Sequence, residues 1–265
     1  MELQARADEA GENPGRRGAG FRHEGAYIGQ DDGVARRWPA MKAMDESHLA
    51  LFRRHMVEIV DLHFDLAADE IGKGALDPAL REAMLDVPRH LFVPPQLALH
   101  SYQDTPLPIG FDKTVSQPFI GALMIDLLDL QPGEDVLEVG TGYGYQAALL
   151  AALGARVRSV EIVEEFAAEA RQRLTALGRR DVSIRVGDGS RGWAERAPFD
   201  KILVTAAAPA PPPALVAQLR PGGRIVIPLG GKDVQQLSVV EKRLDGAIHT
   251  REVMAVRFTQ LETGP

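Results

Sequence analysis

The feature that most constrains this chain is a short apolar run that leads directly into three closely spaced glycines. Val136-Leu137-Glu138-Val139 has the length and the β-branched content of a buried strand, and Gly140-Thr141-Gly142-Tyr143-Gly144 follows without a break. Glycine lets a backbone turn sharply and approach a bound molecule closely. The segment therefore predicts a strand of a parallel sheet that ends in a loop able to hold a nucleotide-like cofactor.

Strand and helix patterns alternate on both sides of this loop. Strands are predicted at 136–139, 157–160, 182–186, 201–204 and 224–227, and helices at 119–128, 146–153, 163–177 and 214–219. A turn is expected at Gly222-Gly223, and 237–241 and 253–258 are expected to form a closing pair of strands. Such alternation predicts an α/β fold, with a doubly wound, mostly parallel, seven-stranded Rossmann-like sheet and an antiparallel final strand.

The residues before this region have a different pattern. Helical spacing begins at Ser47, and a second helix is predicted over 78–85. Prolines interrupt regular structure from 87 to 95, and residues 96–112 are predicted to form a long crossing loop. Long ordered loops in compact domains are often functional, so this part of the chain is a candidate for gating a substrate.

A division of the chain follows from these patterns. Residues 1–40 have few large apolar residues and no period, which predicts a disordered tail, with a start codon placed too early as the alternative explanation. Residues 41–265 form the predicted domain, in which 41–117 are the helical substrate-gating segment and 118–265 the cofactor-binding sheet.

The composition excludes several kinds of function. The 265 residues include 45% hydrophobic residues, enough for a full core, but no run of about 18 apolar residues that could span a bilayer. The net charge of −7 gives no basic surface for nucleic acid or an anionic membrane. Cysteine is absent, and His55, His63, His90 and His100 lack metal-ligand spacing, so we interpret them as surface or packing residues and predict no metal site. We expect a cytoplasmic monomer.

Residues at the carboxyl ends of the predicted strands are candidates for ligand contacts, because ligands of open parallel sheets bind there. Glu161, about twenty residues beyond the glycine loop, can accept hydrogen bonds from two ribose hydroxyls. Asp188 can accept a hydrogen bond from an adenine amino group, while Gly189 leaves room for the ring. These residue types predict an adenosine-containing cofactor.

Two cofactors, NAD and S-adenosylmethionine (AdoMet), would fit such a loop. The glycine spacing is G-x-G-x-G rather than G-x-G-x-x-G, and Glu138 would bring a carboxylate close to a pyrophosphate. AdoMet has no phosphate and carries cationic ammonium and sulfonium groups, so an acid at this position favours AdoMet. On these residues alone NAD remains the alternative.

Eight motifs, in order, resemble those of the protein-L-isoaspartate O-methyltransferases. The resemblance covers about residues 48–260, and the proline-rich loop and the segment around Ser116 are its more specific parts. The motifs are VPRHLFVP (87–94), DTPLPIG (104–110), TVSQP (114–118), LEVGTG (137–142), VGDG (186–189), APFD (197–200), TAAAP (205–209) and QLRPGGR (218–224).

The resemblance implies a repair enzyme. It would methylate the α-carboxylate of L-isoaspartyl residues, and to a lesser extent D-aspartyl residues, in damaged proteins, giving an ester that collapses to a succinimide. Ser116 is implied to orient the substrate carboxylate, with Thr114, Val115 and Pro118 beside the substrate. The implied AdoMet-binding residues are Glu138, Gly140, Thr141, Gly142, Gln146, Glu161, Ile162, Asp188 and Gly189.

Other interpretations stay open on the sequence. Ser116 could simply cap the helix that begins near Pro118. Phe111-Asp112-Lys113 and Tyr143 depart from the commonest family pattern, which bears on substrate preference. The alternative functions are a related O-methyltransferase that modifies aspartate in a dedicated biosynthetic peptide, and a non-catalytic AdoMet-binding module.

Overall fold

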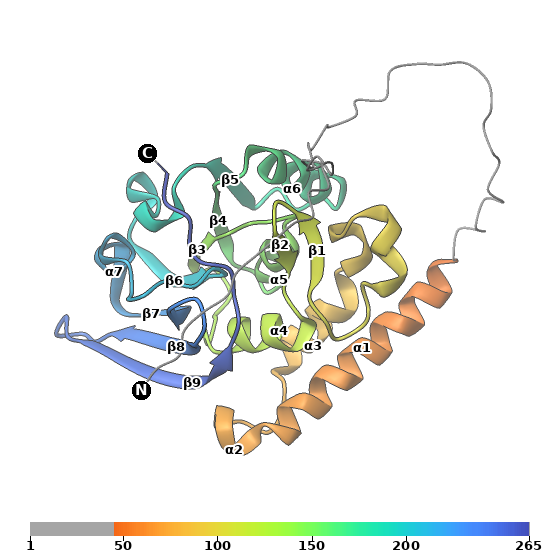
Figure 1. The fold of residues 1–265 in the computed structure, drawn as a ribbon, viewed down its shortest axis with the longest axis horizontal. Helices are drawn as coiled ribbons and strands as arrows, with labels where there is room; N and C mark the ends of the chain where they lie inside the picture. The colour runs from red at the N-terminus through yellow and green to blue at the C-terminus, as the bar shows by residue number, and fades with distance from the viewer. Residues whose placement is uncertain (1–44, 265) are drawn as a thin grey trace, which may run out of the picture. The chain divides into compact units, whose positions relative to one another are not determined.

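A seven-stranded sheet forms the centre of the fold (Figure 1). The computed structural model describes residues 45–264, so the predicted tail, residues 1–40, lies outside the described residues. The strand order is β5-β4-β3-β6-β7-β8-β9. The strands are β3 (Asp135–Val139), β4 (Arg156–Glu161), β5 (Val182–Val186), β6 (Phe199–Val204), β7 (Leu219–Gly230), β8 (Gln235–Lys242) and β9 (Ile248–Val256).

The pairing of these strands confirms the predicted fold class. Strands β3 to β7 pair in parallel, whereas β8 pairs antiparallel with both β7 and β9. Helices alternate with the parallel strands, as the sequence periodicity predicts. The helices are α1 (Glu46–Leu66), α2 (Ala68–Ile71), α3 (Pro78–Asp86), α4 (Pro118–Asp126), α5 (Tyr145–Ala152), α6 (Glu164–Ala176) and α7 (Pro213–Gln218).

Both faces of the central strands of the sheet are buried. Within β6, Leu203 belongs to the hydrophobic cluster that includes residues of α4, α5 and α6, while its neighbours Ile202 and Val204 belong to the cluster that includes Leu215 of α7. Successive residues of a strand face opposite sides, so this alternation places helices on both faces. Among residues 45–264, no helix combines the length and the apolar content that crossing a membrane requires.

The segment before α4 differs from the prediction. Residues 96–112 were expected to be an irregular loop, but they include most of a short 3₁₀ helix, Pro95–His100, and strand β1 (Leu107–Gly110). Strand β1 pairs antiparallel with β2 (Lys113–Val115) to form a hairpin (Figure 1). The turn between them is Phe111-Asp112, with φ values of +49° and +54°. The strands are very short and the turn lacks glycine, so the usual hairpin signals are missing.

The other errors concern the last strands. Gly222 and Gly223 lie within the bounds of β7 and not before it, but the pairing with β6 shifts register between Leu219 and Arg224 and Gly222 has a φ of +83°, so the expected turn is a bulge inside the strand. A Cβ at Gly223 would lie 2.6 Å from the carbonyl oxygen of Asp200, so this glycine permits a close approach of β6 and β7. Strand β9 begins at Ile248, earlier than predicted, because its first five residues are exposed and show no apolar alternation.

Helix α1 is joined to α4 by aromatic packing. Phe64 is fully buried, and its ring lies edge-on to that of Phe119, with centroids 5.6 Å apart and an interplanar angle of 87°. Such pairs add to the stabilisation that comes from the buried apolar area. The contact holds α1 against α4, the helix that begins two residues after Ser116.

Replacement of Phe64 by alanine is therefore expected to lower the free energy of unfolding by about 3–5 kcal/mol, because a cavity would remain between α1 and α4. Leu66→Ala is a control on the same helix, since Leu66 is 73% exposed, and it should change stability by about 0.5 kcal/mol or less. Urea unfolding measures both values. Equal losses for the two variants would contradict the described packing.

Candidate active site

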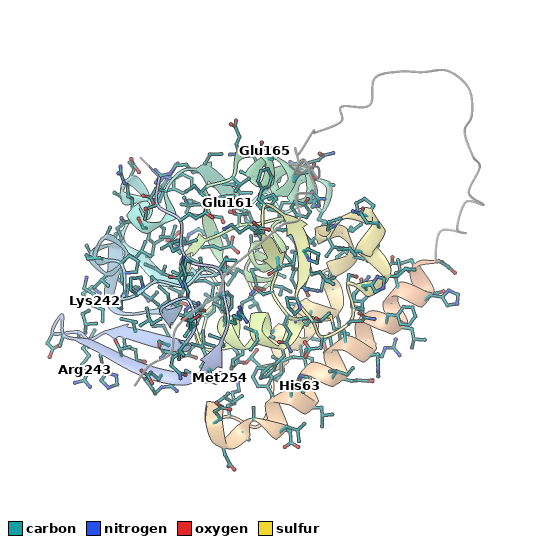
Figure 2. The ribbon with its side chains drawn as sticks, in the orientation of Figure 1. His63, Glu161, Glu165, Lys242, Arg243 and Met254 are labelled. Carbon is teal, nitrogen blue, oxygen red and sulfur yellow. The ribbon has the colours of Figure 1, made fainter. Side chains whose placement is uncertain are left out.

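A large cavity lies at the carboxyl ends of β3, β4 and β6 and reaches the residues of α1 and β9. Its volume is about 1340 Å³, more than the roughly 300–1,000 Å³ of a typical small-molecule pocket. Glu161, His63 and Met254 all line it, and Figure 2 shows Glu161 well separated from the other two. The cavity therefore has room for a cofactor together with part of a second, larger molecule.

Two glycines bring backbone into the wall of this cavity. Gly140 has a φ of +93°, and a Cβ there would lie 2.4 Å from Oγ1 of Thr205. The Thr205 hydroxyl donates to the carbonyl oxygens of Val139 and Gly140, at 3.1 and 2.8 Å. A Cβ at Gly189 would lie 2.3 Å from Cγ1 of Val139. A side chain at either position would clash with the protein itself, so glycine is required at both, and both contribute backbone to the cavity lining.

Glu161 presents a buried carboxylate to the same cavity. Its residue is 5% exposed, and its two carboxylate oxygens accept hydrogen bonds from the backbone amides of Gly142, at 2.8 Å, and Val163, at 3.0 Å. Burial raises the pKa of Glu161 above its ordinary value. Each oxygen retains a lone pair, so the carboxylate can still accept hydrogen bonds from hydroxyl groups of a ligand.

Glu138 lies behind the glycine loop and not in the cavity wall. It is fully buried and accepts a hydrogen bond from the Ser159 hydroxyl, whose oxygen is also 2.5 Å from Oγ1 of Thr141. Among the described residues its Oε1 has no hydrogen-bond partner. Burial, with a smaller effect of Glu161, raises the pKa of Glu138 to about 8, so the neutral acid prevails at about pH 7. The role of Glu138 in cofactor binding stays a prediction, and its position behind the loop differs from the place in the turn that the argument against a pyrophosphate assumes.

The predicted site residues are divided between the cavity and its surroundings. Seven of them line the cavity: Thr114, Ser116, Gly140, Gly142, Glu161, Ile162 and Gly189. Asp188 lines an adjoining pocket of about 480 Å³, which shares Ile162 with the cavity. Gln146 donates to the carbonyl oxygen of Gly121 and so joins α5 to α4. The cavity lining does not include Glu138, Thr141, Gln146, Val115 or Pro118.

Ser116 lies between β2 and α4, and it does not cap α4. The cap comes from Asp104, whose carboxylate accepts hydrogen bonds from the Phe119 amide, at 2.8 Å, and from Nε2 of Gln117, at 2.9 Å. The carbonyl oxygen of Ser116 accepts a hydrogen bond from Nη2 of Arg89 at 2.7 Å. The prediction of a Ser116 cap is wrong because a side chain distant in sequence satisfies the helix terminus.

His63 is a cavity residue that the sequence did not reveal. Its Nδ1 lies 2.7 Å from Oδ2 of Asp104, and its ring packs edge-on to Phe119 with centroids 5.3 Å apart. The interpretation of His63 as a surface or packing residue is therefore incomplete. The amphipathic pattern of α1 gives no signal that could have identified this contact, because Asp104 lies on a separate segment.

Phe111, Lys113 and Tyr143, which depart from the commonest family pattern, contact residues that hold the β1–β2 hairpin beside the cavity. Phe166 of α6 lines the cavity and receives the ring edges of Tyr143 and Phe111, at centroid distances of 5.4 and 5.5 Å. The Tyr143 hydroxyl donates to the carbonyl oxygen of Ile109 at 3.2 Å. Lys113 forms an ion pair with Glu262, so the hairpin also contacts the C-terminal segment, residues 257–264.

The sheet order, the glycine loop and the acid at the end of β4 define a Rossmann-like methyltransferase fold, and two solved structures share it. A protein-L-isoaspartate O-methyltransferase is 28% identical, with a TM-score of 0.67 over 78% of this chain and 65% of that chain. A structure from Plasmodium falciparum, described as a candidate protein-L-isoaspartate O-methyltransferase in complex with S-adenosyl-L-homocysteine, is 23% identical. Its TM-score is also 0.67, over 80% of this chain and 99% of that chain.

Sequence relatives give the narrower assignment. The family model of protein-L-isoaspartate(D-aspartate) O-methyltransferase matches residues 63–264. Protein-L-isoaspartate O-methyltransferase 1 of Polaromonas sp. is 49% identical over 84% of this chain and 95% of the relative. Protein-L-isoaspartate O-methyltransferase 2 of Syntrophobacter fumaroxidans is 48% identical over 85% and 91%. This chain belongs to the protein-L-isoaspartate O-methyltransferase family.

The buried acid Glu138 makes stability depend on pH. Its folded-state pKa of about 8 lies above the ordinary value of 4.5, so between these values the unfolded state ionises while the folded state keeps its proton. The stability that the protonated group contributes is present below about pH 4.5 and is lost as the pH rises towards 8.

Glu138→Gln should therefore flatten this decline, because the amide has nearly the same shape and cannot ionise. We expect the stability of the variant relative to the unmodified protein to rise by up to a few kcal/mol between about pH 5 and pH 8. Urea unfolding without cofactor measures it, and Glu165→Gln, at an exposed position of α6, is the control. Parallel curves for Glu138→Gln and the unmodified protein would contradict the raised pKa.

Proposed function

We propose that this chain transfers the methyl group of AdoMet to the α-carboxylate of L-isoaspartyl residues in damaged polypeptides. The observation that carries the proposal is that Ser116 of the most specific family motif lines the same cavity as Gly140 and Glu161. The family relationship favours this repair activity over methylation of a dedicated biosynthetic peptide and over a non-catalytic cofactor-binding module.

The cavity wall fits AdoMet. Glu161 would accept hydrogen bonds from the ribose hydroxyls, and the backbone at Gly140 and Gly142 would lie against the ligand. Asp188 and Gly189 follow β5 and would hold the adenine, where the adjoining pocket meets the main cavity at Ile162. When bound, AdoMet supplies an electrophilic methyl group carried by a sulfonium.

The proposed reaction depends more on the position of the two reactants than on acid–base catalysis by the protein. A carboxylate with an ordinary pKa of about 4 is already ionised at about pH 7, so it needs no general base to become a nucleophile. The task of the chain is to hold that carboxylate in line with the methyl group and to exclude water. The Ser116 hydroxyl would donate a hydrogen bond to the carboxylate and so orient it, with Thr114 beside the substrate.

The remaining parts of the proposal concern organisation and context. Residues 41–117 would receive the substrate and residues 118–265 the cofactor. Thr114 and Ser116 belong to the first part and line the cavity, which supports this division. Polypeptides that contain isoaspartate would be the partners. A monomeric state, a cytoplasmic location and the lack of nucleic-acid binding complete the proposal, and the net charge of −7 supports the last of these.

The activity is tested by transfer of labelled methyl groups from AdoMet to a synthetic L-isoaspartyl peptide and to its aspartyl twin. We expect base-labile labelling of the isoaspartyl peptide alone. Ser116→Ala should lower kcat/KM by about tenfold or more, because the carboxylate loses its orienting donor. Ser47→Ala, at an exposed position of α1, is the control. Equal labelling of both peptides, or of neither, would contradict the proposed activity.

The cofactor role of Glu161 has its own measurement. Glu161→Ala should raise the Kd for AdoMet by about 10- to 100-fold, as expected for the loss of hydrogen bonds to a charged group. Glu165→Ala removes an exposed acid from the first turn of α6 and should leave the Kd within about twofold of the original, because this side chain is not part of the cavity lining and water screens its charge. Calorimetric titration measures both variants, and an unchanged Kd for Glu161→Ala would refute the role.

A further inference from the structure

Two buried, oppositely charged side chains outside the cavity lining bond to the Ser116 segment, which we define as residues 116–119. Arg89 is 1% exposed, and the side chain of Asp104 is 6% exposed. The cavity lining includes neither of them, so they cannot act by touching the substrate. Both nevertheless bond directly to residues 116–119. Their effect on the reaction must pass through that segment.

We propose that Arg89 and Asp104 are positioning residues that hold the backbone around Ser116 so that its hydroxyl faces the substrate carboxylate. The inference rests on the proposed role of Ser116 and deepens it. It also gives a shared purpose to three of the sequence motifs, because Arg89 lies in residues 87–94, Asp104 in 104–110 and Ser116 in 114–118.

Arg89 ties three separate segments together. Its Nε donates to the carbonyl oxygen of Ser101 at 2.8 Å, and its Nη2 donates to that of Ser116 at 2.7 Å. Its guanidinium carbon lies 4.9 Å from the centroid of the Tyr145 ring on α5. A buried cation costs several kcal/mol of desolvation, and an apolar side chain of similar volume is often at least as stable. Packing alone therefore does not explain an arginine here.

Asp104 holds the residues that follow Ser116. Its carboxylate accepts from the Phe119 amide and from the Gln117 side chain, and His63 lies against Oδ2 on the cavity side. The chain before Ser116 is held differently, by pairing of β2 with β1, in which Val115 lies opposite Leu107. Ser116 is thus the point between two restrained stretches, and the side-chain torsion is its main remaining freedom.

The expected size of the effect follows from the geometry. A displacement of about 1 Å at a reacting group can lower a rate by about 100-fold. Loss of one of the hydrogen bonds to residues 116–119 would let the segment move by a comparable amount. A purely structural role would instead lower the amount of active protein, irrespective of which residue occupies position 116.

A double-mutant cycle separates these two explanations. Arg89→Lys and Asp104→Asn are each made alone and together with Ser116→Ala, and kcat/KM for the isoaspartyl peptide is normalised to the fraction of protein that binds AdoMet. Each single variant should lower kcat/KM about tenfold or more when Ser116 is present, mainly through kcat. In the Ser116→Ala background the same changes should lower it by less than about threefold, because the hydroxyl they position is gone.

The chain offers a matched control for each variant. Arg53 is also buried and donates to a carbonyl oxygen, that of Leu85, as well as to the Tyr102 hydroxyl and Glu46, and none of these bonds goes to residues 116–119. Asp126, the last residue of α4, likewise accepts from a backbone amide, that of Asp77. Arg53→Lys and Asp126→Asn should leave normalised kcat/KM within about twofold of the original, since the hydrogen bonds of these two side chains go to residues outside 116–119.

Each outcome of the cycle decides the inference. Losses for Arg89→Lys and Asp104→Asn that are equal in both backgrounds would overturn the positioning role. If Arg89→Lys fails to fold, the Asp104→Asn cycle is sufficient for the same decision. If Ser116→Ala alone keeps full activity, the role of Ser116 fails and the inference fails with it. Methylation of the isoaspartyl peptide by the unmodified protein would still uphold the proposed reaction.

Discussion

The parallel pairing of β3 with β4 on one side and β6 on the other is the constraint on which the site depends. Backbone hydrogen bonds continue past the strand ends, from the Gly140 amide to Val160 and from the Thr205 amide to Val139, at 2.9 and 3.0 Å. Parallel strands end at the same edge, so this pairing gathers the glycine loop, Glu161 and Thr205. Cofactor chemistry at this edge is a consequence of strand order.

The Ser116 segment is built on a different principle. It is short, and Ser116 and Gln117 lie outside any helix or strand. Helices and strands are held by backbone hydrogen bonds, whereas this segment is held by side chains from distant parts of the chain. Arg89 and Asp104 lie on other segments and satisfy the groups around Ser116 that secondary structure leaves open. The strand ends of the sheet thus form one side of the cavity, and the segment that carries Ser116, the proposed substrate-orienting residue, forms another.

Prediction from sequence succeeded where periodicity is strong and failed where contacts are distant. The strands at 136–139 and 182–186 and the helix at 119–128 follow from local apolar patterns, as does the parallel sheet. The β1–β2 hairpin has strands too short to show a period. No local pattern reveals that Glu138 is fully buried behind the glycine loop, where burial raises its pKa.

The sequence by itself determined the fold class, the glycine loop and the acid at the end of β4, because local spacing and residue type are sufficient for these. Only the tertiary structure decided that Asp104 caps α4, that His63 lines the cavity, and that Arg89 bonds to Ser116. The physical reason is that a hydrogen bond requires proximity in space. Packing of separate segments creates that proximity, so the pattern of residues within one segment cannot predict which distant side chain will bond to it.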